Sequence, residues 1–452
     1  MRFLLLLACA GSLLGEFRAG AFKTVISPPL QDRPPVYMAG FGHNRVAATV
    51  HDDLYARCLA FVGQSSRPVL SSKPLVICEV DLIGFFIDDV LRVRAKVPEA
   101  DVVVASTHVH EGPDTMGLWG PAPGQSGIDD AYNSFVVDRV AEAAKGAIAA
   151  LEPATPALAV VHSSELDSFI DDTRPPVVHD PDLIVLTLTG KGGKRIATAV
   201  NWANHPETLG SRNTQISADY PGFFYRRLEA RLGGIAVLWN GAVGGMQSPL
   251  GAKIKDPATG TIAAENSFRK TQVLGQRIAD LAADAAESAK PVRIDKVEFA
   301  ERIITIPVTN RGFEQAAQVD LYKGRKKTTA DGSTTTSVGL IRMSAAEPAL
   351  AIALVPGEMY PELSVGGVER YAGADFPDAP IETPIKSMLH APFKMLIGLA
   401  DDEIGYIIPK AEWDEKPPYL QNAKKAWYGE ENSVGPDAAA RIAAAIAELA
   451  RQ

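Results

Sequence analysis

Short apolar runs alternate with longer amphipathic stretches along the chain up to about residue 290. Several of these runs are hydrophobic almost without interruption, which is typical of strands that are buried on both faces. The predicted strands are residues 75–84, 101–108, 157–162, 183–189, 196–203 and 235–240. The predicted helices are residues 129–151, 220–232, 271–288 and 436–451. This alternation predicts an α/β fold with a layered, mixed β-sheet core that is flanked by helices.

The pattern changes after residue 290, where strand-like runs follow one another with few helices between them. These runs are residues 296–308, 339–343, 350–355 and 393–399. They predict an antiparallel or mixed extension of the sheet. Residues 322–337 are polar and are expected to form a hairpin or loop. We find no internal repeat and no long linker, so we expect a single large domain.

The N-terminus has the features of a targeting segment. Arg2 precedes an apolar run over residues 3–14, and Ala19 and Ala21 place small residues at the positions that a signal peptidase reads. This pattern predicts a secretory signal peptide at residues 1–21, a mature domain at residues 22–452, and a secreted or periplasmic protein. A lipoprotein site at Cys9 and a buried first strand or helix are the alternatives. The rest of the sequence holds no apolar stretch near the 20 or so residues of a membrane span.

Composition and charge limit the classes of protein and of binding partner that fit this chain. The chain has 452 residues, 46% of them hydrophobic, which is ample for a large core. Its net charge is -9 and its pI is about 5.5, so it lacks the basic footprint of a nucleic-acid-binding protein and we expect no such partner. Three cysteines are too few for a disulfide framework. Cys58 and Cys78 either pair in an oxidising compartment or remain buried thiols.

Polar residues gather where the predicted strands end. We find no nucleophile elbow, no zincin motif, no Walker loop and no dinucleotide fingerprint. His108 and His110 close one predicted strand, His205 follows another, and Glu358 follows a third. Residues two apart in a strand point to the same side, so His108 and His110 can bind a metal together or act as ligand and base. Glu358 can complete a His/His/Glu metal set.

A glycine-rich stretch at residues 240–249 follows a further predicted strand. Its glycines let the backbone approach a ligand closely, and Ser248 is a candidate nucleophile or hydroxyl contact. Each of these motifs is by itself also compatible with an ordinary turn at the end of a strand. Together they indicate a metal centre.

With these motifs in place, the chain resembles the neutral/alkaline, non-lysosomal ceramidase family, in its N-terminal catalytic domain. The resemblance rests on segments that come in the family's order and span roughly residues 36–436. They are residues 40–61, 106–113 (STHVHEGP), 204–219, 240–249, 356–358 (PGE) and 398–408. It implies a single large catalytic domain and a hydrolase that acts on linear amide bonds.

The resemblance also implies one zinc ion per chain, held by two histidines, a glutamate and a tyrosine. The matching residues here are His108, His205, Glu358 and Tyr406. His110 would act as the base beside the metal, and Ser248 would position a substrate hydroxyl or act as the nucleophile. Arg174 or Tyr428 would stabilise the developing oxyanion, although Trp427 competes with Tyr428 for the match.

The chain departs from the family pattern in places. The stretch Gly-Met-Gln-Ser-Pro-Leu around Ser248 lacks the aspartate and asparagine of the family's G-D-x-S-P-N element, and Glu111 stands where the family carries serine. The family's C-terminal immunoglobulin-like domain is expected to be absent. The metal ligands therefore transfer more directly than the substrate does.

These observations predict a secreted, zinc-dependent amidohydrolase that cleaves the N-acyl bond of ceramide or a related N-acyl lipid. The expected partners are that lipid or another N-acyl small molecule, with peripheral contact to a membrane. One alternative is a zinc hydrolase of other amides or of esters. Another is a non-catalytic lipid- or glycan-binding exoprotein on the same scaffold.

Overall fold

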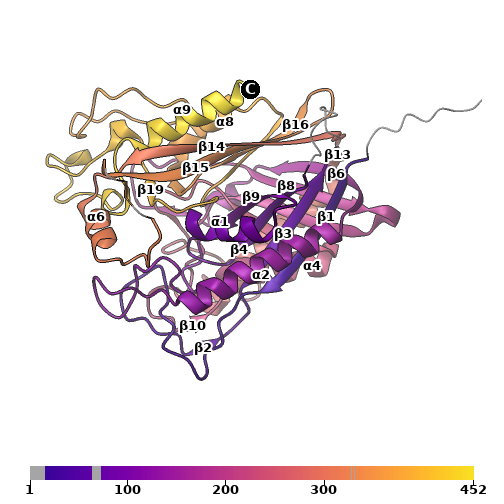
Figure 1. Ribbon diagram of the computed structural model, residues 1–452, viewed down its shortest axis with the longest axis horizontal. Helices are drawn as coiled ribbons and strands as arrows, with labels where there is room; N and C mark the ends of the chain where they lie inside the picture. Colours follow the sequence, from indigo (N-terminus) through magenta and orange to yellow (C-terminus); the bar gives the residue numbers. More distant parts are fainter. Residues whose placement is uncertain (1–15, 64–72, 327, 330) are drawn as a thin grey trace, which may run out of the picture.

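Two β-sheets packed face to face, with helices outside each of them, make up the fold (Figure 1). The computed structural model describes residues 16–63, 73–326, 328–329 and 331–452. The layers run helix, sheet, sheet, helix, and the apolar side chains of each layer meet those of the next. The predicted α/β fold with a layered, mixed sheet is confirmed.

The first sheet is mixed and contains nine strands within the described residues, in the order β11-β9-β8-β6-β1-β3-β4-β5, with β13 beside β6. Only the pairs β11–β9 and β4–β5 are parallel. The strands are β1 (Arg18–Val25), β3 (Tyr55–Val62), β4 (Leu75–Val80), β5 (Asp101–Ser106), β6 (Glu152–Val161), β8 (Leu183–Gly190), β9 (Arg195–Trp202), β11 (Ile235–Asn240) and β13 (Lys290–Pro291).

The second sheet has the order β14-β15-β16-β18 and is antiparallel except for the pair β16–β18. Its strands are β14 (Lys296–Pro307), β15 (Ser333–Ser344), β16 (Pro348–Leu354) and β18 (Phe393–Ile397). The prediction that these runs extend the first sheet is wrong. Ile341 and Ile352 pack against the first sheet, whereas Leu340 and Ala351 face a helix, so the strands form a separate layer. The predicted polar loop at 322–337 also ends early, because β15 begins at Ser333.

Three short strand pairs lie in the loops beyond the sheets. They are β2 (Thr49–Val50) with β10 (Gln215–Ile216), β7 (Asp171–Asp172) with β12 (Gln247–Ser248), and β17 (Glu358–Met359) with β19 (Tyr406–Ile407). The last two pairs tie together segments that carry predicted site residues.

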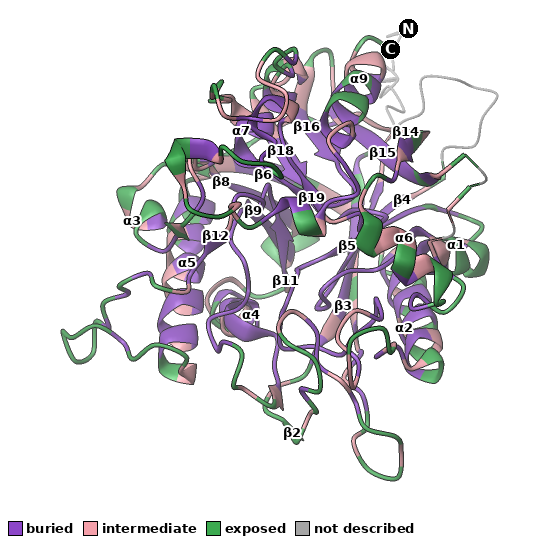
Figure 2. Cartoon of the chain, turned by 90° about the vertical axis from the view of Figure 1, so that its left-hand side faces the viewer, coloured by how far each residue is buried: buried purple, intermediate pink, exposed green. Residues whose placement is uncertain are grey.

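Helices cover the outer face of each sheet, and their exposed residues point outward (Figure 2). The first sheet is covered by α1 (Ile87–Lys96), α2 (Asp130–Ala149), α4 (Asp219–Leu232) and α5 (Phe268–Ser288), and the second by α9 (Ala438–Ala450). The shorter helices are α3 (Ser164–Asp167), α6 (Arg311–Gln318), α7 (Pro361–Val365) and α8 (Ile385–Met388). Among the helices described, none is long and apolar enough to span a bilayer.

The alternating sides of the strands explain the continuous hydrophobic runs. In β4, Val76 and Cys78 face α2 whereas Leu75 and Ile77 face the second sheet, so every position meets an apolar layer. The start of α2 is fixed by the side chain of Asp129, which accepts hydrogen bonds from the backbone N–H groups of residues 131 and 132.

The predicted domain boundary between residues 21 and 22 falls inside β1. This strand pairs with β3 along its whole length, and with β6 through Arg18 and Ala19. Phe17 and Ala19 are buried against other core side chains. Most of the predicted signal segment lies in residues 1–15, outside the described residues, and the signal itself stays a prediction.

Cys58 and Cys78 are joined by a disulfide between the adjacent strands β3 and β4. The two residues stand directly opposite each other in the antiparallel register, and both are fully buried. Of the two alternatives left open by the sequence, the structure shows the bonded one.

Reducing this disulfide should lower the free energy of unfolding by about 2–4 kcal/mol, because the bridge restricts the unfolded chain. The cysteines are 20 positions apart, so the bridge closes a loop of moderate length. Urea unfolding with and without a thiol reductant measures the difference. The Cys58→Ala/Cys78→Ala variant is the control and should not respond to the reductant. Equal midpoints for the unmodified protein in both conditions would show that the bridge adds no stability.

Candidate metal centre

The carboxyl ends of several strands meet at one place. β5, β9 and β11 end there from the first sheet, and β16 and β18 end there from the second. Asn240, the last residue of β11, ties the loops together. Its Nδ2 donates to the carbonyl oxygens of Thr107 at 2.8 Å and Asn204 at 3.1 Å. Its own carbonyl oxygen accepts from the N–H of Gly398 at 3.0 Å. The loops that carry the predicted residues are thus fixed to one another.

His108 and His205 point their Nε2 atoms at the same carboxylate oxygen. His108 Nδ1 lies 2.7 Å from the carbonyl oxygen of Ile83, and His205 Nδ1 lies 2.7 Å from that of Gln247. These carbonyls can only accept, so each Nδ1 donates and each Nε2 is the nitrogen available to a metal ion. Without a metal, a proton on Nε2 is donated to Glu358. Glu358 Oε2 lies 3.2 Å from Nε2 of His108 and 3.0 Å from Nε2 of His205. This is the arrangement expected of metal ligands oriented by backbone carbonyls.

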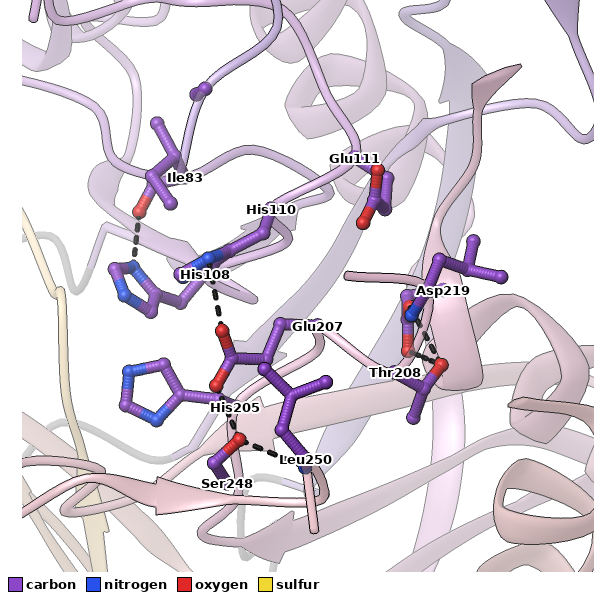
Figure 3. Close-up of polar contacts among 12 residues, drawn as sticks. Ile83, His108, His110, Glu111, His205, Glu207, Thr208, Asp219, Ser248 and Leu250 are labelled. Atoms are coloured by element: carbon purple, nitrogen blue, oxygen red, sulfur yellow. Dashed lines mark hydrogen bonds and ion pairs between the residues drawn. The ribbon is translucent and has the colours of Figure 1, made fainter. Parts of the chain in front are cut away.

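The predicted strand 101–108 ends at Ser106, so the argument that His108 and His110 share one side of a strand is wrong. His108 instead adopts the left-handed backbone conformation, with φ of 69°, in the loop that follows. The loop nevertheless brings the two rings to 4.9 Å, and Figure 3 shows them beside His205.

His110 belongs to a second possible ligand set. Ligand atoms of His108, His110 and His205 all lie within 4.8 Å of one another, and all three residues are buried. This set can hold a metal ion. It shares His108 and His205 with the predicted set, in which Glu358 and Tyr406 take the remaining positions.

Gly40 leaves room for the His110 ring. Its φ is +93°, and a Cβ atom at this position would lie 2.4 Å from Cγ of His110. Only glycine adopts this conformation readily and avoids the clash. The edge of Phe41 packs against the same ring, with 5.1 Å between the ring centroids.

Tyr406 is brought to the centre by the short parallel pair β17–β19, in which Glu358 and Tyr406 are directly opposite. Its hydroxyl donates to the Sδ of Met246 at 3.4 Å. Burial raises the pKa of Tyr406 well above its usual value, and the nearby Glu358 raises it further. Ionisation of this phenol therefore requires positive charge close by.

The electrostatics of the cluster favour a cation. Burial raises the pKa of the Glu358 carboxyl, but His108 and His205 more than offset this and hold it well below its usual range. Burial disfavours the charged form of His205, yet its hydrogen bond to Glu358 and the charge of Glu207 raise its pKa to about 9. The pKa of His110 is lowered by burial, and His108 and His205 lower it further. Two carboxylates and three imidazoles so close together suit a metal ion.

Ser248 contacts a carboxylate. Its hydroxyl donates to Oε1 of Glu207 and accepts from the backbone N–H of Leu250 at 3.0 Å (Figure 3). Oε2 of Glu207 lies 3.3 Å from Nδ1 of His110. Burial raises the pKa of Glu207. The sequence does not single out Glu207, although it stands two positions after His205.

Arg174 lies behind the site. Its guanidinium forms a two-point ion pair with Glu430, with both contacts at 2.7 Å, and donates to the carbonyl oxygens of Tyr428 at 3.0 Å and Glu412 at 3.1 Å. The oxyanion role predicted for it stays a prediction. The contacts observed give it a structural role, because they hold the segment that carries Tyr428.

Tyr428 stands at the mouth of the site. It is 48% exposed, lines the cavity described below, and its ring centroid lies 5.9 Å from that of Tyr406. Trp427, its competitor in the sequence match, turns away and donates from Nε1 to the carbonyl oxygen of Leu420 at 3.1 Å. The geometry therefore favours Tyr428 over Trp427.

A cavity of about 760 Å³ opens beside the histidines. Its lining includes His108, His110, Glu358, Tyr406 and Tyr428. The rest is mostly apolar and comes from the loop after β4, from the 116–119 loop and from α6 and the turn that follows it. These apolar residues include Ile83, Phe86, Met116, Leu118, Trp119, Phe313, Leu321 and Tyr322. A volume of this size is typical of ligand pockets.

Comparison with solved structures identifies proteins of similar fold. No protein-family profile matches the chain, and no curated protein sequence matches it. The neutral ceramidase from Pseudomonas aeruginosa has a similar structure, with a TM-score of 0.69 and 17% identity over 96% of this chain and 74% of that one. A ceramidase complexed with C2 gives a TM-score of 0.70 and 16% identity over 96% of this chain and 75% of that one. The predicted resemblance is confirmed at the level of the fold, and the chain has the fold of the neutral ceramidases.

Proposed function

We propose that the chain is a zinc-dependent amidohydrolase that cleaves the N-acyl bond of ceramide or a related N-acyl lipid, releasing a fatty acid and an amine. One observation carries the proposal. The Nε2 atoms of His108 and His205 converge on one oxygen of Glu358, and His108 and Glu358 line a largely apolar cavity of about 760 Å³. Two solved structures of similar fold are ceramidases, which supports the same reaction.

We propose that one zinc ion per chain is held by His108, His205, Glu358 and Tyr406, which supply the nitrogen and oxygen ligands that zinc prefers. When bound, zinc polarises the amide carbonyl and lowers the pKa of a water molecule. The carbonyl oxygens behind His108 and His205 hold the two rings in register for this ion.

His110 then serves as the base. Burial keeps its imidazole neutral, so it is ready to take a proton from the attacking water and return it to the leaving amine nitrogen. Tyr428 donates its hydroxyl hydrogen toward the developing oxyanion from the mouth of the cavity. Arg174 supports this step through its bond to the backbone of Tyr428.

The apolar wall formed by Trp119, Phe313, Leu321 and their neighbours accepts the hydrocarbon chain of the substrate. The exposed Tyr428 at the mouth offers contact with a lipid surface. The Cys58–Cys78 disulfide supports a secreted or periplasmic location, since such bonds persist in oxidising compartments.

Two histidine substitutions distinguish the two ligand sets. His205→Ala should lower the bound zinc from one per chain to a small fraction, because it removes a ligand common to both sets. His110→Ala should keep the zinc and lower kcat by about 10²–10⁴-fold, as expected for loss of a general base. Zinc content after gel filtration and initial rates on N-acylsphingosine measure both effects.

His162→Ala is the matched control, because this imidazole is 65% exposed and its carboxylate contact is Asp182, away from the cavity lining. It should keep both the zinc and the activity. Loss of zinc from His110→Ala would instead identify the three histidines as the ligand set.

Hydrolysis of N-acylsphingosine should depend on zinc. The purified protein should release fatty acid from N-acylsphingosine, lose this activity with a chelator, and regain it when zinc is added back. A long-chain amide and a matched long-chain ester are assayed in parallel, with liberated fatty acid as the readout. Release from the ester or from soluble amides alone would assign a different zinc hydrolase. Zinc binding without any hydrolysis would leave a non-catalytic lipid- or glycan-binding protein.

Substitution of Ser248 distinguishes a positioning hydroxyl from a nucleophile. We expect Ser248→Ala to lower kcat by no more than about tenfold, because the Ser248 hydroxyl pairs with the Glu207 carboxylate, a weaker base than the imidazole of a Ser–His pair. Initial rates and a search for a burst of amine release measure this. Loss of activity by about 10⁴-fold or more, together with a burst in the unmodified protein, would identify Ser248 as the nucleophile.

A further inference from the structure

We propose that Glu207 is a positioning residue for His110. Its carboxylate accepts the Nδ1–H of this imidazole and leaves the Nε2 lone pair as the proton acceptor of the reaction. The inference rests on the proposed function in one respect, namely that His110 is the base.

The side chains of Glu207 and His110 are in contact. Glu207 Oε2 lies 3.3 Å from His110 Nδ1, slightly beyond the 2.7–3.2 Å range of an N–H···O bond. Catalytic hydrogen bonds are often long before substrate binds and tighten afterwards. Within the described part of the chain, neither nitrogen of His110 has a hydrogen-bond partner, and the ring is buried.

The burial of His110 makes this pairing necessary. A neutral imidazole carries one N–H that must be donated, and a buried donor without an acceptor costs free energy. The carboxylate of Glu207 is within reach of Nδ1. Donation from Nδ1 makes Nε2 the unprotonated nitrogen, as in a carboxylate–histidine pair.

The carboxylate itself is held by Ser248. The N–H of Leu250 donates to the Ser248 hydroxyl oxygen, and this hydroxyl donates to Oε1 of Glu207 (Figure 3). With Oε1 occupied in this way, Oε2 is turned toward His110. Ser248 therefore acts on His110 through Glu207.

The backbones of the two loops are also tied together. The N–H of His110 donates to the carbonyl oxygen of Pro206 at 3.0 Å, immediately before Glu207. On the other side, the hydroxyl of Thr208 donates to the carboxylate of Asp219, at 2.7 and 2.8 Å from its two oxygens. Asp219 is the first residue of α4, so Glu207 lies on a loop anchored at both ends.

The test compares Glu207→Gln with the unmodified protein, both loaded with zinc. Glutamine keeps the size of the side chain and removes its charge, and its amide can donate to Nδ1, which favours the other tautomer. We expect kcat on N-acylsphingosine to fall about 10–100-fold with the zinc content unchanged. KM should change by less than about twofold, because substrate contacts remain.

A second readout needs no substrate. Long-range ¹H–¹⁵N correlation spectra of ¹⁵N-histidine-labelled protein report which ring nitrogen carries the proton, and loss of signals in His110→Ala assigns His110. The unmodified protein should show the Nδ1–H form of His110, and Glu207→Gln should shift it toward Nε2–H. Glu165→Gln is the matched control, since this carboxylate pairs with Arg277 beside α3 and should change neither readout.

Unchanged kcat together with an unchanged His110 spectrum in Glu207→Gln would overturn the proposal. Loss of zinc from this variant would also overturn it, because Glu207 would then hold the metal site. If the unmodified protein releases no fatty acid but the His110 tautomer still depends on Glu207, the proposed function fails and the positioning role stands.

Discussion

A buried carboxylate shared by two imidazoles is the constraint on which the site depends. Glu358 is removed from water, and a charge in that position is costly unless it is compensated. His108 and His205 compensate it from opposite loops, and each ring is held by a backbone carbonyl behind it. The loops must therefore keep their places to within a fraction of an ångström. The network around Asn240 meets this requirement by tying three loops to one residue, two through its side chain and one through its backbone carbonyl.

The layering of the fold explains why these loops meet. Both faces of the first sheet are covered, one by helices and one by the second sheet, so its strands are buried along their length. The polar side chains of the candidate site come from the loops at the ends of the strands, where both sheets contribute. The histidines come from the first sheet, and Glu358 and Tyr406 follow strands of the second. The candidate centre thus lies at the edge where the two layers come together.

Local pattern predicted most of the elements, and β11 at residues 235–240 agrees at both ends, where polar and glycine residues mark the limits. Pattern failed where the answer depended on distant partners. The signal predicted at residues 1–21 overlaps the first residues of β1, because an apolar segment near the N-terminus has the same composition as a buried strand. The second sheet was taken for an extension of the first, since alternation along a strand does not reveal which layer it faces. Glu207 carries no local sequence signal, because the residues that it contacts, Ser248 and His110, are far away in sequence.

The two halves of the large sheet are joined by a narrow seam. β11, β9, β8 and β6 lie on one side and β1, β3, β4 and β5 on the other. Among the described residues, only Arg18–Pro153 and Ala19–Glu152 are paired between these two groups of strands. His108 follows β5 on one side, and His205 follows β9 on the other. An ion held by both histidines would cross-link the two halves of the sheet. Metal affinity and stability against unfolding would then be thermodynamically linked. Truncation of β1 would therefore weaken metal binding, although β1 lies away from the metal ligands.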